Sequence, residues 1–183
     1  MRRVGGFIMK KELLIIDGYN MIGSWPELVK LKDKDEMEDA RDLLLHELAN
    51  YQQYEGMDIR VVFDAQLVPG IQKTYKKYHL SVVFTKEGET ADSYIERMIG
   101  EENLLITQVT VATSDLAEQW LVFQRGALRK SANELYNDLK RAKKAIDADA
   151  KDYRFQNYRR NSPWNHHQLD TLEKLRDDLT KEK

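Results

Sequence analysis

The chain of 183 residues contains no cysteine, and this absence removes whole classes of chemistry. Disulfide bonds, thiolate zinc sites and cysteine nucleophiles are excluded. No apolar run approaches the roughly 20 residues that a membrane-spanning helix needs. Residues 1–8 include two arginines but no long apolar core, so we expect no secretory signal. These absences predict a cytoplasmic protein that has no disulfide partner and does not enter a membrane.

Several common catalytic patterns are missing as well. The sequence has no glycine-rich phosphate loop and no GxGxxG fingerprint. Its four histidines are scattered, and nothing indicates a serine–histidine triad. A haloacid-type phosphotransferase would need a second aspartate two residues after Asp17, where Tyr19 stands. A receiver domain would need paired acids after its first strand, where this chain offers one.

The chain carries little net charge, −2 at pH 7, but its charges are unevenly distributed along the sequence. Up to Gln124 we count 14 Lys and Arg against 21 Asp and Glu, a net charge of about −7. From Arg125 onward the counts are 15 and 10, a net charge of about +5. An acidic half joined to a basic half suits a polyanionic substrate that is held near metal ions. A solvated surface of mixed charge is the plainer interpretation of the same counts.

Apolar runs alternate with helical patterns, and this alternation is the signature of βαβ units and of an α/β fold. A loop containing Gly18, Gly23 and Pro26 is expected after the first strand. We expect strands at 12–16, 59–63, 80–84 and within 104–112. We expect helices at 36–54, 90–99, 115–124 and 131–146, with Ser131 and Glu134 as a capping box.

Three segments follow from this pattern. Residues 1–9 are expected to be a disordered N-terminal extension, because Met9 looks like a second, more natural start. Residues 10–146 form the main domain. Residues 147–183 are expected to be a polar, basic and aromatic connector followed by a C-terminal amphipathic helix. Four leucines mark that last helix: Leu169, Leu172, Leu175 and Leu179.

Five acidic residues lie where a parallel sheet would gather them. The acids are Asp17, Asp64 and Asp115 at the ends of expected strands, and Glu89 and Asp92 just after another. In an open α/β sheet, ligands bind beyond the carboxyl ends of the strands. Carboxylates crowded there repel one another unless a cation neutralises them. Hard oxygen ligands suit Mg²⁺ or Mn²⁺, so the pattern predicts a divalent metal site for chemistry on phosphates.

Each motif also has a plainer interpretation. Asp17-Gly18-Tyr19-Asn20 contains ordinary turn residues, although the Asn20 amide could also hold a carboxylate or a phosphate oxygen. Asp92 in a first helical turn complements the helix dipole, and Asp115 beside Ser114 suits an N-cap. Asp64 suits a turn. The occurrence of all of them at successive strand ends favours a shared site.

Four segments together resemble the NYN domains, which are relatives of the PIN nucleases. The segments read LIIDGYN at 14–20, VFDA at 62–65, ETAD at 89–92 and ATSD at 112–115. Their order and spacing look like the YacP branch, and the resemblance extends through residues 126–132 to cover about 10–146.

The resemblance implies a PIN-like, three-layer α/β/α domain with a central, mostly parallel sheet and a C-terminal helical extension. It also implies a Mg²⁺ or Mn²⁺ site and endonucleolytic cleavage of mRNA at the ribosome. By position, Asp17, Asp92 and Asp115 match the metal-binding and catalytic acids, and Asn20 matches the motif asparagine. Glu89 and Asp64 are further metal ligands in this interpretation.

A ribonuclease must also bind its RNA, and three zones of basic residues are candidates for this contact. The residues are Lys73, Lys76 and Lys77, then Arg125, Arg129 and Lys130, and finally Arg154, Arg159 and Arg160. Bases interleaved with aromatic residues, as around Tyr75 and Tyr158, can pair phosphates and stack nucleobases. Exposed side chains without a ligand are the alternative in each zone. Trp25 suits either stacking on a base or covering the core.

Two other functions stay open on the sequence alone. The chain could be a catalytically silent RNA-binding module. It could also be a nuclease that acts on free RNA, in rRNA or tRNA maturation or in the manner of a toxin.

Overall fold

A six-stranded sheet in the strand order β5-β6-β4-β3-β7-β8 forms the centre of the main domain. The computed structural model describes residues 3–4, 7–8, 10–64, 74–77, 79–115, 119, 122–161, 168, 171–172 and 174–175. Five of the strands run parallel, and β5 (Thr74–Lys77) pairs antiparallel with β6 at one edge. The expected α/β fold with a mostly parallel sheet is confirmed.

Strand β3 (Lys11–Asp17) is the middle of the sheet and its last five residues are buried. It pairs with β4 (Asp58–Phe63) on one side and with β7 (Thr107–Ala112) on the other. β6 (Leu80–Phe84) extends the sheet beyond β4. These four strands lie where the sequence predicts them. The two edge strands, β5 and β8 (Leu128–Lys130), are short, so they carry no apolar pattern that would predict them.

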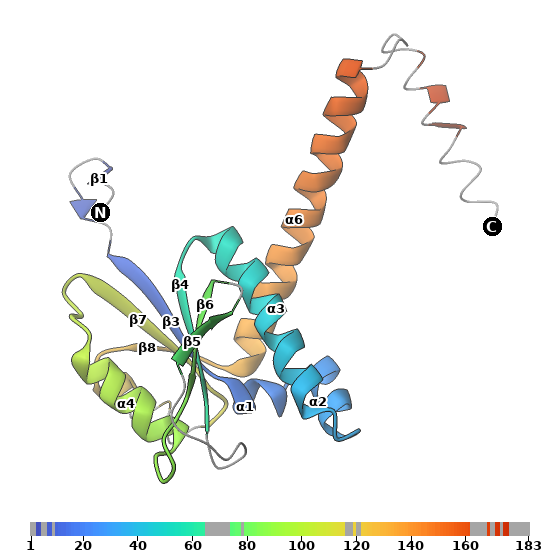
Figure 1. Cartoon of the computed structure of the whole chain (residues 1–183). Coiled ribbons are helices and arrows are strands. Elements are labelled where there is room, and N and C mark those ends of the chain that lie inside the picture. The colour runs from blue at the N-terminus through green and yellow to red at the C-terminus, as the bar shows by residue number, and fades with distance from the viewer. Residues whose placement is uncertain are drawn as a thin grey trace. The chain divides into compact units, whose positions relative to one another are not determined.

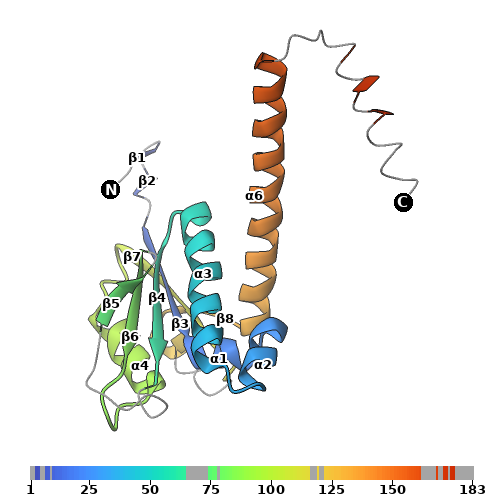
Figure 2. The same cartoon turned by 45° about the vertical axis from the view of Figure 1, so that its right-hand side comes forward.

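Helices cover both faces of the sheet, as Figures 1 and 2 show for α4 on one side and α3 on the other. Leu14 and Ile16 of β3 face a core built with α1 (Gly18–Ile22), α2 (Pro26–Lys32), α3 (Met37–Glu55) and the start of α6 (Ala132–Asn161). Leu13 and Ile15 face a second core built with α4 (Ala91–Glu101). Alternate residues of one strand therefore serve two helical layers.

The segment after β3 corrects the expectation of a loop. It folds into two short helices, α1 and α2, of five and seven residues. Asp17 caps α1 by accepting a hydrogen bond from the Asn20 backbone N–H, and Pro26 begins α2 at a position that tolerates its missing N–H. Helices of one or two turns are too short to show an apolar period, which is why the sequence pattern missed them.

Helix α6 (Ala132–Asn161) begins as predicted but extends beyond the expected end near residue 146. The capping box is confirmed: the Glu134 N–H donates to Ser131 Oγ at 3.2 Å, and the Ser131 N–H donates to Glu134 Oε2 at 2.6 Å. Residues 147–151 are exposed and helical. The expected connector therefore continues the helix, because a polar helix has no apolar stripe to reveal it.

The chain divides into two compact units, Met1–Lys143 and Lys144–Lys183. In the N-terminal extension, expected to be disordered, Arg3–Val4 pairs antiparallel with Phe7–Ile8 as strands β1 and β2. In the expected C-terminal amphipathic helix, residues 168, 171–172 and 174–175 are helical, and Leu172 and Leu175 are exposed. Leu169 and Leu179 lie outside the described residues. No helix in the described parts of the chain is long and apolar enough to cross a membrane.

Candidate functional site

Asp17 lies at the carboxyl end of the central strand, and its side chain is almost fully buried, with 7% exposed. Its Oδ1 accepts from the Asn20 backbone N–H at 3.1 Å, and its Oδ2 accepts from the Asn20 amide at 3.4 Å. The side-chain Oδ1 of Asn20 in turn accepts from the Ser114 backbone N–H at 3.0 Å. Asn20 therefore connects the end of β3 to the loop after β7, the loop that carries Asp115.

The loop after β7 is ordered by its own polar residues. The Asp115 backbone N–H donates to Thr113 Oγ1 at 3.1 Å, and the hydroxyls of Ser114 and Ser24 lie 3.1 Å apart. Asp115 is exposed. The expected helix from 115 to 124 is described at residues 119 and 122–124, and Gly126 follows it with a φ of 80°. The Thr113-Ser114-Asp115 motif thus places a solvent-facing acid beside the buried one.

Gly18 is required by its contact with the next strand. A Cβ atom at this position would lie 2.2 Å from Cε1 of Phe63, which is far inside any real contact. Phe63 is fully buried at the end of β4. The absence of a side chain at Gly18 therefore lets α1 begin directly against β4, so that the Asp17 and Asp64 strand ends lie close to each other.

Asp92 enters the site from helix α4. Thr90 caps this helix by accepting from the Ser93 N–H at 3.2 Å, which places Asp92 in the first turn. Burial raises the pKa of Asp92, and repulsion from Asp115 and then Asp64 raises it further. Asp92 is therefore close enough to the strand-end acids Asp115 and Asp64 to be repelled by both.

The pKa of Asp17 is also raised, mainly because the carboxyl is buried. The Asn20 hydrogen bonds lower this pKa, and repulsion from Asp92 raises it. Asp92 is thus the acid that links Asp17 to Asp115 and Asp64. The sequence grouped these four acids at one edge of the sheet, and the structure brings them within electrostatic reach of one another.

The donor set fits a hydrated divalent cation. Among the residues that the structure describes, no three acidic or histidine side chains are placed so that together they could hold a metal ion. Mg²⁺ is usually held by one or two carboxylates and keeps several of its waters, so it does not need three protein ligands. Asp17, Asp92 and Asp115 supply hard oxygen ligands, and a cation between them would relieve the repulsion that raises the Asp92 pKa.

Glu89 is held in a different way. Its Oε1 accepts from the Arg97 guanidinium at 2.8 Å, and Arg97 also reaches Glu101 at 3.3 Å. The Oε2 atom of Glu89 is buried and has no hydrogen-bond partner in the described part of the chain. The neighbour that the structure gives Glu89 is therefore a guanidinium, whereas Asp92, three residues later, faces other acids.

The basic residues proposed for RNA contact have protein partners where their side chains are described. Arg125 pairs with Glu96, Arg129 donates to Gln119 at 3.1 Å, and Lys130 pairs with Asp138 at 2.7 Å. Lys76 and Lys77 lie on the edge strand β5, and Arg154, Arg159 and Arg160 lie on α6, but their side chains are outside the description. Lys73 lies outside the described residues.

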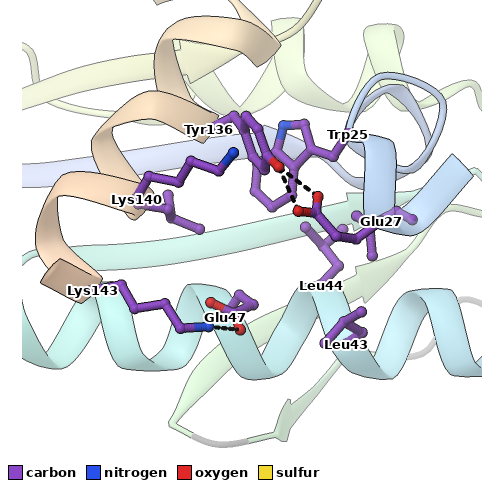
Figure 3. Close-up of a pocket in the computed structure, with 10 residues that line it drawn as sticks. Trp25, Glu27, Leu43, Leu44, Glu47, Tyr136, Lys140 and Lys143 are labelled. Carbon is purple, nitrogen blue, oxygen red and sulfur yellow. Dashed lines mark hydrogen bonds and ion pairs between the residues drawn. The ribbon is translucent and has the colours of Figure 1, made fainter. Parts of the chain in front are cut away.

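Trp25 packs in the core rather than presenting its ring as an open stacking surface. It is 3% exposed, its indole N–H donates to the Ala132 carbonyl at 3.0 Å, and its ring lies 5.5 Å from that of Tyr136. Figure 3 shows these two rings beside a cavity of about 160 Å³ between α2, α3 and the start of α6. The Tyr136 hydroxyl donates to Glu27 there, at 2.6 and 2.7 Å from its two oxygens, and Lys143 pairs with Glu47.

The sequence analysis did not single out Arg41, which lies beside the acidic site on α3. Its guanidinium donates to the Tyr19 hydroxyl at 3.2 Å, two residues beyond Asp17. The sequence does contain a sign of it, because position 41 lies on the same helical face as Met37 and Leu44. An apolar residue is usual on such a face, so an arginine there is an exception.

Comparisons with known proteins identify the family of this chain. The family profile described as YacP-like NYN domain matches residues 14–177. A curated relative, the protein YacP of Bacillus subtilis (strain 168), is 48% identical over 136 residues, which are 74% of this chain and 79% of that protein.

Two solved structures are also similar. The crystal structure of Rae1 (YacP) from Bacillus subtilis matches with a TM-score of 0.70 and 42% identity, over 90% of this chain and 94% of that one. A tryptophan-to-leucine mutant of the same protein matches with a TM-score of 0.69 and 43% identity, over 78% of this chain and 83% of that one. With its nuclease-like fold, this chain belongs to the family of YacP-like NYN domains.

Proposed function

We propose that this protein is a metal-dependent endoribonuclease that cleaves mRNA in association with the translating ribosome. The observation that carries the proposal is the group of mutually repelling acids at the carboxyl ends of the parallel strands. Asp17 is buried and repelled by Asp92, and Asp92 is repelled by Asp115 and Asp64. Carboxylates that repel one another cost folding free energy, and a functional requirement for a cation would explain why they are kept.

The chain's own residues would hold and orient the reacting groups. Asp17, Asp92 and Asp115 would hold Mg²⁺ or Mn²⁺, which when bound polarises a phosphate oxygen and lowers the pKa of bound water. Asn20 fixes the Asp17 carboxylate through two hydrogen bonds and fixes the loop after β7 through a third. Hydrolysis at such a site would leave a 5′-phosphate and a 3′-hydroxyl.

The choice of mRNA and of the ribosome rests on the family resemblance and on the basic half of the sequence. A cytoplasmic location would accompany both. A nuclease that acts on free RNA, or a silent RNA-binding module, would share the same fold. The raised pKa of Asp92 favours an active enzyme over a silent module, because a binding module has no use for acids that repel both one another and RNA.

The test is a cleavage assay on a defined mRNA, with and without translating ribosomes, at controlled Mn²⁺ and Mg²⁺. We expect metal-dependent cuts that appear with ribosomes and are lost in Asp17→Asn. Equal cutting of free RNA would reject the dependence on the ribosome. Binding without any cutting under every metal condition would show a silent module.

A further inference from the structure

A row of aromatic rings and one arginine lies beside the acids at the same end of the sheet. The Tyr19 and Phe63 rings meet edge to face with centroids 5.2 Å apart, and the Phe63 and Phe84 rings stack at 5.3 Å. The Arg41 guanidinium lies 6.0 Å from the Phe84 ring centre and donates to the Tyr19 hydroxyl. The row therefore crosses the carboxyl ends of β3, β4 and β6, and Arg41 joins its two outer rings.

The charge of the Arg41 guanidinium is not neutralised by a close ion pair of the kind that other arginines of this domain make. Only 15% of the Arg41 side chain is exposed, yet its ion pair within the described part of the chain is a long one, 3.8 Å to Glu38, whose side chain is almost fully solvated. Arg97 and Arg125, in contrast, each make a close ion pair with a glutamate. A guanidinium has five N–H donors in a planar fork that matches a phosphate. Among the described residues, Arg41 uses one of them for Tyr19.

We propose that Arg41 and Tyr19 form a phosphate-binding subsite for single-stranded RNA, next to the acidic site. The idea rests on the proposed function for its substrate, and it adds the residues that position the strand. The Arg41 guanidinium would bind a backbone phosphate through its remaining donors. The Tyr19 hydroxyl, which accepts from Arg41, would donate its own hydrogen to the same phosphate group.

The aromatic row explains why the strand would be unpaired. Tyr19 and Phe84 are partly exposed, whereas Phe63 between them is fully buried and holds both rings in place. Partly exposed rings beside a cation are typical of surfaces that stack bases of single strands while binding their phosphates. Because Tyr19 is two residues beyond Asp17, the bound phosphate would lie close to the cleavage position.

The test measures RNA affinity separately from cleavage. Binding of a fluorescein-labelled, unstructured oligoribonucleotide is followed by fluorescence anisotropy in EDTA at several salt concentrations. We expect Arg41→Ala to weaken binding about tenfold, which is the effect of losing one charged hydrogen bond. The slope of log K against log salt should flatten by ~0.7, the value for one phosphate contact on a single strand. Tyr19→Phe should weaken binding less and leave the slope unchanged.

Lys11→Ala is the matched control, because it also removes one positive charge. Lys11 pairs with Asp58 at 2.7 Å, at the opposite, amino end of β3 and β4, so the variant should keep the wild-type affinity and slope. Arg41→Lys keeps the charge and the alkyl chain but loses the fork. Arg41→Lys should therefore retain the salt slope and show an intermediate affinity. It replaces Arg41→Ala in the binding assay if Arg41→Ala unfolds below the assay temperature.

Wild-type affinity in both Arg41→Lys and Tyr19→Phe, or an equal loss in Lys11→Ala, would overturn the subsite. The outcome is distinguishable from that of the proposed function. A protein that never cuts RNA but binds it through Arg41 would reject the nuclease and keep the subsite. A protein that cuts RNA with unchanged affinity in the Arg41 variants would keep the nuclease and reject the subsite.

Discussion

The acids in and just before helix α4 fall into two sets, and the two sets have different neighbours. Glu89 and Glu101 share Arg97, and Glu96 pairs with Arg125, so each of these acids has a guanidinium partner. Asp92 instead faces Asp115 and Asp64, and its pKa is raised. The helix spans Ala91–Glu101, and Glu89 lies just before its N-cap. The difference teaches that these acids are not one uniform solvated face: one set is paired with arginines, and Asp92 has acidic neighbours, as the proposed metal site would require.

The largest expected effect comes from removing a charge from the acids of the proposed metal site. Asp17→Asn and Asp92→Asn should each reduce RNA cleavage by at least ~100-fold, since even residues that only support metal ligands cost up to that much. Asparagine keeps the oxygen with which Asp17 caps α1, so the fold should survive. Cleavage rates with labelled RNA, next to circular dichroism spectra, measure this. A folded variant that cuts at the wild-type rate would remove its residue from the site.

The basic side chains of the second unit provide the next test, since they carry the charge that RNA requires. Replacing Arg154, Arg159 and Arg160 with alanine should weaken RNA or ribosome binding and flatten its salt dependence, by ~2 in the slope if each residue binds one phosphate of a single strand. Affinity for Mn²⁺ should be unchanged. Sedimentation with ribosomes at two salt concentrations measures this. Loss of thermal stability with wild-type binding would instead show that these residues support the packing of the C-terminal unit.

A substitution at Gly18 tests whether the acidic site depends on the close approach of α1 and β4. Gly18→Ala should cost about 1–3 kcal/mol of unfolding free energy, because the new methyl group would overlap the Phe63 ring. Gly100→Ala is the matched control: nothing lies within 4 Å of its Cβ position in α4, so stability should hold or rise. Urea unfolding curves measure both. Equal stability of the two variants would show that Phe63 moves aside without cost.

The pH dependence of stability gives a smaller effect with a definite sign. The pKa of Asp17 is raised in the folded state, so the folded protein binds this proton more tightly than the unfolded chain does. Stability is therefore lost as pH rises from the unfolded value near ~3.9 through the raised folded value. In EDTA, Asp17→Asn should melt at or above the wild-type temperature at pH 7, and the difference should shrink toward pH 4. A lower melting temperature at pH 7 would contradict the burial cost.

Glu89 gives the smallest expected effect and sharpens the comparison most. Glu89→Gln changes an acid that already has Arg97 as its partner, so cleavage should stay close to the wild-type rate while stability falls by up to about 1 kcal/mol. Asp92→Asn, three residues further along the chain, should abolish cleavage. If both variants lost cleavage equally, Glu89 would belong to the metal site after all.

The sequence predicted the central strands and the gathering of acids because both depend on chain order. Apolar runs that end in Asp17, Asp64 and Asp115 place those acids at one edge of any parallel sheet. The partner of Glu89 could not be predicted in this way, since it depends on how the segment before α4 lies relative to Arg97 on that helix.

Arg41 was missed for a related reason. Its neighbour Tyr19 comes from a short helix that showed no period, so no pattern joined the two residues. The second half of α6 was missed because its exposed, polar residues give no apolar stripe, and burial is the signal on which helix prediction depends.

The hydrogen bond between Asn20 and Ser114 joins residues 94 positions apart. Strand β3 also needs β7 beside it before the sheet is complete, and contacts this distant in sequence form late because a long loop must close first. During synthesis the chain emerges from its N-terminus, so Asp17 leaves the ribosome long before Asp115. The acids can therefore meet only after most of the first unit has been made, and a nascent or truncated chain that ends before β7 has no assembled site.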